Sequence, residues 1–450
     1  GSYIQYTKGA PDVVVTKCAY YLKDGKACPM TKEYEAEILK ANKAMADKAL
    51  RVLACAQRVW TDKPASAEPA DLEQDLCFAG LCGMIDPVRP EVKAAIVECR
   101  EAGIRPVMIT GDHVDTAVAI AKELGIITET THAITGAQLD QMDDAEFEKE
   151  FRNISVYARV QPEHKTRIVN AWRNAGYITA MTGDGVNDAP SIKAADIGVG
   201  MGITGTDVTK NVADMVLTDD NFATIVGAVE EGRRIYDNIR KAIQFLLGSN
   251  MSEVLSIFFA TLMGFAILQP VHLLWINLVT DCFPALALGM EKAEPDIMKR
   301  KPRDAKAGIF AGGMGIDIAY QGAFITLLTL GSYFIGHYME SGVWEITNSA
   351  HGTTMAFVTM SMAEIFHSMN MRSQRGSIFK LGSHNKVLFW AGLGSLLATT
   401  LVCEVPFLAA AFEFTSVEPM EYVVALVMGA LIIPVVELVK FIQRKMNKEK

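Results

Sequence analysis

The sequence has 450 residues, of which 50% are hydrophobic and 21% are charged, and its mean hydropathy is +0.18. This composition is too apolar for an ordinary soluble protein and too charged for a protein that lies wholly in a membrane. The formal net charge of −9 argues against nucleic acid as a partner, because binding to a phosphate backbone requires clustered positive charge.

The chain divides into two regions near Tyr236. Up to about residue 238 charged and apolar residues are mixed, and beyond it long apolar runs alternate with short polar loops. Six of the eight cysteines lie in the first region without the paired spacing of a zinc site, which indicates free thiols in a reducing compartment. We therefore expect a cytosolic first region and a membrane-embedded second region.

Short apolar runs alternate with helical segments from residue 78 onward. The expected strands are FAGLCGMID, RPVMITGD, ISVYARV, YITAMTGDG, DIGVGMG and DMVLTDD, and the expected helices cover 90–102, 114–124, 162–174 and 187–195. This alternation predicts a parallel, doubly wound α/β sheet. Ligands bind such sheets at the carboxyl ends of the strands, where Asp86, Thr110 to Asp112, Arg159 and the stretch from Asp184 to Asp188 lie.

The stretch GDGVNDAP and its neighbours are suited to magnesium and phosphate. Asp184 and Asp188 are four residues apart, and Mg²⁺ takes one or two carboxylates together with phosphate oxygens. Lys165 at the start of a helix, the Thr110 hydroxyl and the Gly111 amide are suited to compensate the charge of a transferring phosphoryl group. Together these residues predict a phosphoryl-transfer site.

Each of these motifs also has a simpler explanation. GDGVNDAP alone is an acidic turn that caps a helix, TGD alone is an ordinary turn, and Lys165 alone is a solvated charge on a helix. The stretch GMGITG fits the G-x-G-x-x-G pattern of dinucleotide sites, but no βαβ unit with a fitting acidic residue accompanies it, so we interpret it as a turn. The order and the surroundings of the other three motifs favour the functional interpretation.

Six apolar segments in the second region are long enough to cross a membrane, at about 20 residues per crossing. They are 240–264, 269–289, 313–336, 352–371, 386–411 and 420–442, and the fourth is the least apolar. Lysine and arginine gather in the loops after the second and the fourth segment and in the tail, whereas the alternate loops contain neither. Because cytosolic loops collect positive charge, this bias predicts that both ends of the chain face the cytosol.

The second of these segments carries polar side chains in apolar surroundings. Asn277, Thr280 and Asp281 are three and four residues apart and so share one face of an α-helix. An ionised Asp at the centre of a membrane helix costs about 2.5 to 3.5 kcal/mol, so it persists only where it faces a cavity or a partner. The three oxygen-bearing side chains predict a cation site.

Five motifs resemble those of the P-type ATPases, specifically calcium pumps of the sarcoplasmic-reticulum type. They are KGAPD, DPVRPEV, MITGDH, MTGDGVNDAP and NLVTDCFPALALG, in this order along the chain. The resemblance implies the later part of an α+β nucleotide-binding domain in residues 1–78 and a haloacid-dehalogenase-like (Rossmannoid) α/β phosphorylation domain in residues 79–238. It also implies an all-α membrane domain of six transmembrane helices in residues 239–450.

The resemblance further implies roles for individual residues. The residues that match phosphate and magnesium positions are Thr110, Gly111, Asp112, Lys165, Asp184, Asn187 and Asp188, with Asp184 as the Mg²⁺ ligand. Those that match contacts to ATP or its phosphates are Lys8, Gly9, Arg51, Arg89 and Arg159. Those that match calcium ligands are Asn250, Glu253, Asn277, Thr280, Asp281 and Glu364. The residue types support the last set, because intramembrane carboxylates such as Glu364 are functional by default.

As a whole, the resemblance implies an ATP-driven pump that uses Mg²⁺, forms an aspartyl phosphate, exports Ca²⁺ and counter-transports protons. Its lipid bilayer is a bacterial plasma membrane or a eukaryotic internal membrane, and helix 221–245 is expected to couple the phosphate site to the ion site. The family's phosphorylated aspartate lies in a D-K-T-G-T motif that these residues do not contain. We therefore expect the chain to be the carboxyl-terminal portion of a longer pump, inactive without the amino-terminal portion.

Two alternatives remain open from the sequence. One is a membrane-anchored phosphatase of the haloacid-dehalogenase type, or a regulatory subunit, that does not transport ions; in that case Glu253 and Glu364 form a buried pair satisfied by local hydrogen bonds. The other is a pump for Mn²⁺ or Na⁺, since carboxylate and amide oxygens also serve these cations.

Overall fold

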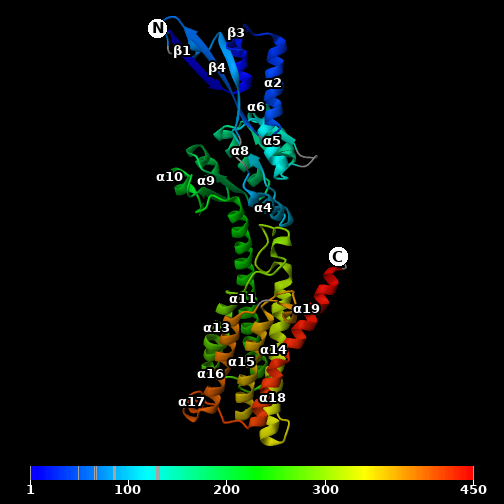
Figure 1. The fold of residues 1–450 in the computed structure, drawn as a ribbon. Coiled ribbons are helices and arrows are strands. Elements are labelled where there is room, and N and C mark those ends of the chain that lie inside the picture. The colour runs from blue at the N-terminus through cyan, green and yellow to red at the C-terminus, as the bar shows by residue number, and fades with distance from the viewer. Residues whose placement is uncertain are drawn as a thin grey trace. The chain divides into compact units, whose positions relative to one another are not determined.

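The computed structural model describes residues 2–48, 50–64, 66, 68–84, 88–127, 132–382 and 384–448. Residue contacts divide the chain into one unit of Gly1–Ala228 and Met298–Ala305 and a second unit of Val229–Ile297 and Lys306–Lys450. The first unit is mixed α/β and the second is helical, as the sequence predicts (Figure 1).

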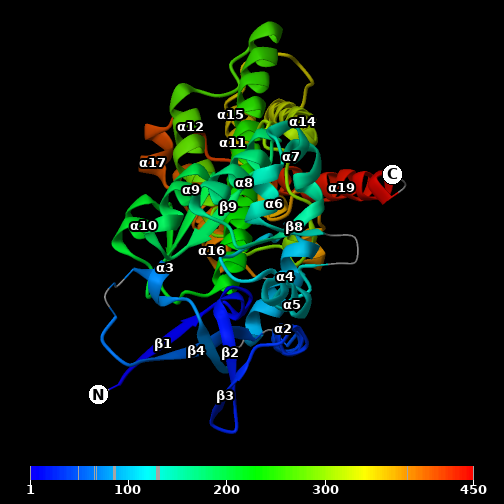
Figure 2. The same ribbon diagram turned by 90° about the horizontal axis from the view of Figure 1, so that it is seen from above.

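A five-stranded mixed sheet forms the amino-terminal part of the first unit. In spatial order its strands are β1 (Tyr3–Gly9), β4 (Arg51–Trp60), β5 (Leu76–Met84), β2 (Cys18–Lys23) and β3 (Lys26–Pro29), and the helices α1 (Pro11–Val14), α2 (Lys32–Ala46) and α3 (Pro69–Leu72) accompany it. Asp24 and Gly25 both have positive φ between β2 and β3, which is the turn that an Asp-Gly pair favours in a hairpin. This hairpin projects from the edge of the sheet (Figure 2).

The position of β5 differs from the expectation. The segment FAGLCGMID is predicted to open the parallel sheet, but β5 pairs with β4 and β2 in the first sheet. The prediction failed because an apolar run indicates that a segment forms a strand but does not indicate which strands it pairs with. The boundary expected between residues 78 and 79 falls inside β5, and Asp86 lies outside the described residues.

Two three-stranded sheets follow, and every strand pair in them is parallel. One has the order β6 (Met108–Ile109), β8 (Ile154–Ala158), β7 (His132–Thr135), and the other β11 (Met215–Leu217), β10 (Ile197–Met201), β9 (Ala180–Gly183). The helices of this part are α4 (Pro90–Glu101), α5 (Val114–Glu123), α6 (Gly136–Gln141), α7 (Asp144–Glu150), α8 (Pro162–Asn174), α9 (Ala189–Ala194) and α10 (Asp207–Val212). The predicted parallel pairing is therefore confirmed, in two sheets rather than one.

The second unit is a bundle of long helices. Its elements are α11 (Phe222–Met263), which begins in the first unit, α12 (Pro270–Trp275), the π-helical segment η4 (Ile276–Asp281), α13 (Cys282–Leu288), α14 (Met314–Ser341), α15 (Ala350–Asn370), α16 (Lys386–Glu404), α17 (Pro406–Ala411), α18 (Pro419–Ala430) and α19 (Ile432–Lys448). Prolines interrupt two of the predicted segments. Pro406 begins a separate helix after an extended Val405, and Pro434 lacks the N–H that would bond the carbonyl of Ala430, where α18 ends.

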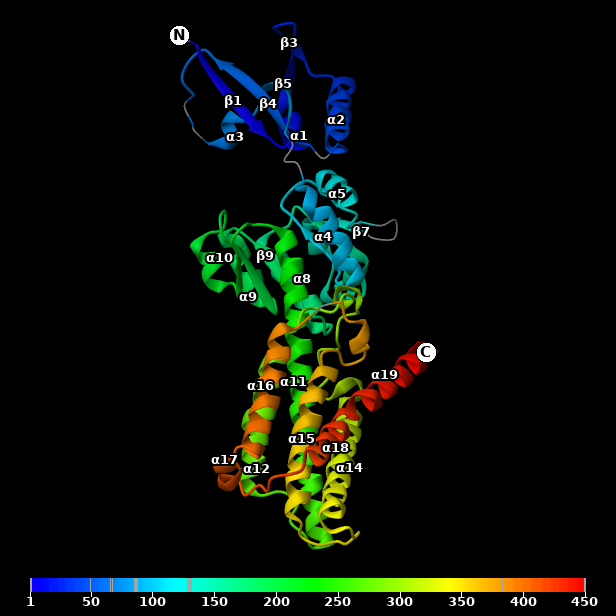
Figure 3. The same cartoon turned by 60° about the horizontal axis from the view of Figure 1, so that its bottom comes forward.

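Among the described residues, five helices are long and apolar enough to cross a membrane. They are Phe222–Met263, Pro270–Leu288, Ala311–Ser341, Lys386–Glu404 and Pro419–Met446. The remaining predicted crossing, the fourth segment 352–371, corresponds to α15, which packs against α14, α16 and α18 and is almost wholly buried (Figure 3). A helix enclosed by other helices needs no lipid-facing side chains, which accounts for its lower hydropathy. That α15 crosses the membrane stays a prediction.

Glycines allow the helices around α15 to approach one another closely. A Cβ atom added to Gly429 in α18 would lie 2.9 Å from the Cβ of Met362 and 3.1 Å from the carbonyl oxygen of Thr359, both in α15. In α14, a Cβ atom on Gly336 would lie 3.0 Å from the Cα of Gly352 in α15. Small residues at helix crossings allow such close packing in membrane proteins.

We expect Gly429→Ala to lower the thermal unfolding midpoint of the full-length protein in detergent. The added methyl group forces α18 away from α15, and overpacking of this kind costs about 1 to 3 kcal/mol. Gly394→Ala in α16 is the matched control, because nothing lies within 4 Å of a Cβ at that position. Equal midpoints for the two variants would contradict the tight crossing of α15 and α18.

Candidate functional site

The TGD loop after β6 is fixed against the loop after β8 in the first unit. The N–H of Thr110 donates to the carbonyl of Tyr157 (2.9 Å), that of Arg159 to the carbonyl of Asp112 (3.0 Å), and that of Val160 to the carbonyl of Thr110 (3.3 Å). The Thr110 hydroxyl also donates to the Asp112 carboxylate at 3.2 Å. The carboxyl ends of these two parallel strands therefore form one rigid edge.

In the GDGVNDAP loop after β9, Asp188 is buried and Asp184 is exposed to solvent. The carboxylate of Asp188 is buried, pairs with the ammonium of Lys165, and accepts the N–H groups of Asp184 (3.3 Å) and Gly185 (3.2 Å). A Cβ atom on Gly183 would lie 2.4 Å from the Cβ of Asp188, so only glycine fits there. Asp184 is exposed, and it is therefore the carboxylate of this loop that is open to a magnesium ion.

Two arginines of the predicted nucleotide contacts lie at the TGD loop and its neighbour. Arg51 at the start of β4 lies 3.9 Å from the Asp112 carboxylate, and the Arg159 guanidinium contacts both carboxylate oxygens of Asp12 at 3.2 and 3.3 Å. Arg159 has a φ of 49°, and a Cβ atom on Gly136 would lie 2.5 Å from its carbonyl oxygen. Desolvation acts to raise the pKa of Asp12, but the hydrogen bonds and charge of Arg159 outweigh it and hold that pKa below its usual value.

The remaining candidates of the first unit are more scattered. Lys8 and Gly9 end β1, where they pair with Cys55 and Ala54 of β4. Gly111 and Asn187 are exposed in the TGD and GDGVNDAP loops. Arg89 donates to the carbonyl of Asp219 at 3.4 Å, and no hydrogen bond between described residues joins it to either loop.

The GMGITG stretch forms a loop that closes on an aspartate of the same chain. The Asp220 carboxylate accepts the N–H groups of Gly202 (2.6 Å), Ile203 (3.0 Å) and Thr204 (2.7 Å). Desolvation acts to raise the pKa of Asp220, but these hydrogen bonds lower it to about 2. Residues 202–205 form this loop, in line with the interpretation as a turn, whereas Gly200 and Met201 belong to the end of β10.

Three carboxylates from three helical elements meet in the second unit. Glu253 of α11, Asp281 of η4 and Glu364 of α15 are buried, and one oxygen of each lies within 4.8 Å of the others. The Asn277 amide donates to both oxygens of Glu253 at 2.9 and 3.1 Å, and the Thr280 hydroxyl donates to Glu364 at 3.0 Å. The structure thus brings these five predicted residues together.

The environment of Asp281 differs from that of a carboxylate in a structural hydrogen-bond network. Both of its carboxylate oxygens are buried, and neither takes part in a hydrogen bond within the part of the chain that the structure describes. A buried carboxylate without a partner is costly, and three carboxylates this close together repel one another unless positive charge or protons neutralise them. Carboxylate and hydroxyl oxygens are the ligands that hard cations such as Ca²⁺ prefer. The residues present therefore fit a cation.

The segment that carries Asn277, Thr280 and Asp281 is a π-helix, whereas the sequence predicts an α-helix. Pro284 lies four residues after Thr280 and has no N–H to donate to the Thr280 carbonyl, which removes one α-helical hydrogen bond. Single turns of π-helix occur frequently at functional sites. The wider turn still directs all three predicted side chains to the carboxylate group.

Ser249 belongs to this group although it was not predicted from the sequence, and the predicted residue Asn250 lies apart from it. The Ser249 hydroxyl donates to Glu364. Its signal in the sequence is a polar stripe on α11, since Ser249, Glu253 and Ser256 recur at helical spacing on an otherwise apolar helix. Asn250 is exposed and its amide donates to the Leu246 carbonyl at 2.7 Å; no hydrogen bond between described residues joins it to the carboxylates.

Comparison with known proteins gives consistent matches over both units. Residues 1–91 match the family model described as "P-type ATPase, cytoplasmic domain N", and residues 265–442 match "Cation transporting ATPase, C-terminus". Over 98% of its length the chain is 45% identical to "Calcium-transporting ATPase 1" of Bacillus cereus, and over 94% it is 44% identical to "Calcium-transporting ATPase" of Bacillus subtilis. It is 35% identical, over 98% of its length, to an endoplasmic reticulum calcium ATPase of Aspergillus fumigatus. The matched regions cover 51%, 47% and 49% of these relatives, so the chain spans about half their length.

Proposed function

Because this chain belongs to the P-type ATPases, and within them to the cation-transporting group, we propose that it acts in an ATP-driven pump that exports Ca²⁺. The observation that carries the proposal is the buried group of Glu253, Asp281 and Glu364, in which Asp281 lacks a hydrogen-bond partner among the described residues. A protein that merely anchors a soluble domain has no use for three such carboxylates inside a helical bundle. The relatives' names, each a calcium transporter, favour Ca²⁺ as the ion.

We further propose that the chain works as the carboxyl-terminal portion of the pump. In this role the two parallel sheets are the core of a haloacid-dehalogenase-type phosphorylation domain, and the pump cycles through an aspartyl phosphate. Asp184 would hold the Mg²⁺ that accompanies ATP, which would supply positive charge at the transferring phosphoryl group. Lys165 keeps the charge of Asp188 balanced beside it, while Arg51 and Arg159 are suited to hold the nucleotide phosphates.

Proton counter-transport is part of the same proposal. Once the carboxylate group releases its divalent cation, the negative charges of Glu253, Asp281 and Glu364 have no counter-ion in a low-dielectric surrounding. Protons are the smallest species that restore neutrality. We therefore expect the group to return with protons bound.

The membrane orientation proposed from the sequence has support within the second unit. The loops without lysine or arginine lie together at one end: the Ala266 N–H donates to Asn348 at 2.9 Å, and His272 contacts the Phe412 carbonyl at 2.7 Å. We propose that this end faces away from the cytosol. The lysine- and arginine-bearing loops then face the cytosol, in a bacterial plasma membrane or a eukaryotic internal membrane.

The decisive experiment measures ATP hydrolysis and ion uptake by the full-length protein in sealed vesicles. Ca²⁺ is expected to stimulate hydrolysis at micromolar concentration and to accumulate in the vesicles, while Mn²⁺ and Na⁺ are tested in competition. Hydrolysis of phosphate esters that requires Mg²⁺ but no further cation would instead identify a membrane-anchored phosphatase. Stimulation by Mn²⁺ or Na⁺ alone would support an ion pump but would show that the transported ion is not Ca²⁺.

A further inference from the structure

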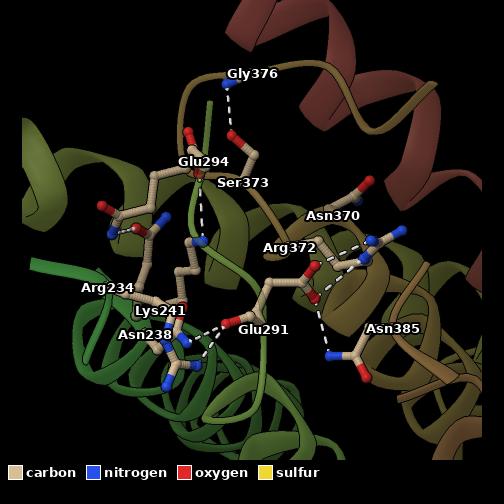
Figure 4. Close-up of polar contacts among 12 residues, drawn as sticks. Arg234, Asn238, Lys241, Glu291, Glu294, Asn370, Arg372, Ser373, Gly376 and Asn385 are labelled. Carbon is tan, nitrogen blue, oxygen red and sulfur yellow. Dashed lines mark hydrogen bonds and ion pairs between the residues drawn. The ribbon is translucent and has the colours of Figure 1, made fainter. Parts of the chain in front are cut away.

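A buried ion pair joins two helix ends on the side of the second unit that carries the lysine- and arginine-rich loops. Glu291 follows α13, and its carboxylate accepts two hydrogen bonds from the Arg372 guanidinium, at 3.0 and 3.2 Å (Figure 4). The Glu291 side chain is 3% exposed and the Arg372 side chain is 13% exposed. A bidentate pair of this kind fixes both separation and orientation, which a single contact between flexible side chains does not.

Asn385 adds a third helix end to this ion pair. Its amide nitrogen donates to the Glu291 carboxylate at 2.9 Å and to the carbonyl of Ala287, in the last turn of α13, at 3.0 Å. Its amide oxygen accepts the N–H of Leu388 and so caps the first turn of α16. One side chain therefore holds the end of α13, the start of α16 and the Glu291 carboxylate together.

Helix α11 contacts the same segment from its other side. Arg234 and Asn238 donate to the Glu291 carbonyl at 3.0 and 2.7 Å, and Lys241 lies 3.3 Å from the Glu294 carboxylate (Figure 4). The segment after α13 is therefore held between α11 on one side and Arg372 and Asn385 on the other. Asn238, Lys241 and Glu291 are buried, and the Arg234 side chain is 25% exposed.

The chain segments that form this ion pair follow directly on the elements that carry Asp281 and Glu364 of the carboxylate group. Glu291 comes ten residues after Asp281, and Arg372 comes eight residues after Glu364. An apolar cluster of Phe245, Ala287, Leu288, Met371 and Leu388 packs beside the pair and includes residues from α11, α13, α16 and the end of α15. Because packed interiors transmit displacement with little compression, a shift at Glu291 moves α13 as a body.

We propose that Glu291 is a positioning residue of the cation site, whose pairing with Arg372 and Asn385 sets the distance between Asp281 on η4 and Glu364 on α15. The proposal rests on the cation-pump function proposed above. Glu291 touches neither the ion nor the nucleotide, and it acts through the register of α13 against α15. Its removal alters how tightly the group binds a cation, and it leaves phosphoryl transfer at saturating ion unchanged.

The test is the Ca²⁺ activation curve of ATP hydrolysis by the full-length pump with Glu291→Gln. The concentration for half-maximal activation is expected to rise about 5-fold with little change in the maximal rate, which lies within the range found for substitutions along coupled networks. Arg372→Gln is expected to give a similar rise, and the double variant no more than either alone, because the two residues act as one unit. Glu291→Asp keeps the charge and is expected to recover most of the affinity.

Glu345→Gln is the matched control, because Glu345 is exposed in the loop between α14 and α15, and its activation curve is expected to coincide with that of the wild type. Should Glu291→Gln not fold, Asn385→Ser keeps a hydroxyl cap on α16 while it removes both amide donors, and a rise of about 2-fold is expected. A folded Glu291→Gln or Asn385→Ser pump with an unchanged midpoint overturns the positioning role. Failure of the wild type to respond to Ca²⁺ counts against the pump itself, so the two failures are distinguishable.

Discussion

Replacing Asp281 with Asn is expected, on the proposed function, to raise the Ca²⁺ concentration for half-maximal ATP hydrolysis by the full-length protein about 100-fold or more. Asp281 is buried beside Glu253 and Glu364, and no described residue donates a hydrogen bond to it, so the proposed function assigns the cation as its partner. Removing one member of a buried charge pair costs about 3 to 5 kcal/mol, and every 1.4 kcal/mol is a factor of ten in affinity. The measurement is the rate of ATP hydrolysis as a function of free Ca²⁺.

Asp317→Asn is the matched control for this experiment. Asp317 is also a buried aspartate of the second unit, but it pairs with Arg375 at 3.1 Å and accepts from Gln443 at 2.8 Å. Its substitution is expected to lower the thermal unfolding midpoint and to leave the Ca²⁺ midpoint in place. Equal Ca²⁺ affinity in the Asp281→Asn variant and the wild type would refute the cation site.

Asp184→Asn is expected to lower the maximal rate of ATP hydrolysis about 1,000-fold at saturating Ca²⁺. The exposed carboxylate of Asp184 is the group of the GDGVNDAP loop that is open to Mg²⁺, since Asp188 is held by Lys165 and two backbone amides. Loss of one preorganised electrostatic contact at a transferring group typically costs about 100- to 1,000-fold, and a divalent ion contributes more than a single hydrogen bond. A Mg²⁺ titration of the steady-state rate separates weaker ion binding from slower chemistry.

Asp144→Asn in α7 controls for the change of charge in the same unit. The Asp144 side chain is 93% exposed and contacts Arg167 only at the surface of α8, so the rate is expected to stay close to that of the wild type. A rate for Asp184→Asn within about tenfold of that control would show that the phosphoryl-transfer site lies elsewhere.

From residue 78 onward the longer strands and helices follow from the sequence patterns, and the errors there concern strand neighbours, helix continuity and short elements. Strand β8 is buried on both faces and is apolar except for Ser155, a composition typical of a parallel strand. The strand β7 has only the four residues His132–Thr135 and escapes detection, because a stretch this short has no periodicity to recognise. Hydropathy is also a poor guide to α15, whose neighbours in the bundle replace lipid around it.

Part of the carboxylate site could be predicted from the sequence because burying a charged side chain in an apolar helix is costly, so few residues other than functional ones do so. Carboxylates such as Asp281 and Glu364 are rare in apolar helices, so each can be recognised in the sequence as a candidate site residue. The π-helical turn at Ile276–Asp281 changes the hydrogen-bond pattern within a single turn, and such a local change leaves no periodic signal in the sequence. The pairing of Glu291 with Arg372 joins residues 81 positions apart in loops where charge is ordinary, so only the folded arrangement reveals it.

The amides of the glycine-rich loop after β10 bind the carboxylate of Asp220, an anionic group of the same chain. A phosphate that entered this loop would have to displace the Asp220 carboxylate from the amides of Gly202, Ile203 and Thr204, and that carboxylate is tethered to the loop by the chain itself. Tethering of this kind corresponds to an effective concentration of about a millimolar or more, so a dilute dinucleotide competes poorly. The Asp220 carboxylate thus takes the place that a phosphate group of a dinucleotide would take in such a loop. We therefore expect nicotinamide or flavin nucleotides to leave the thermal unfolding midpoint of this protein unchanged.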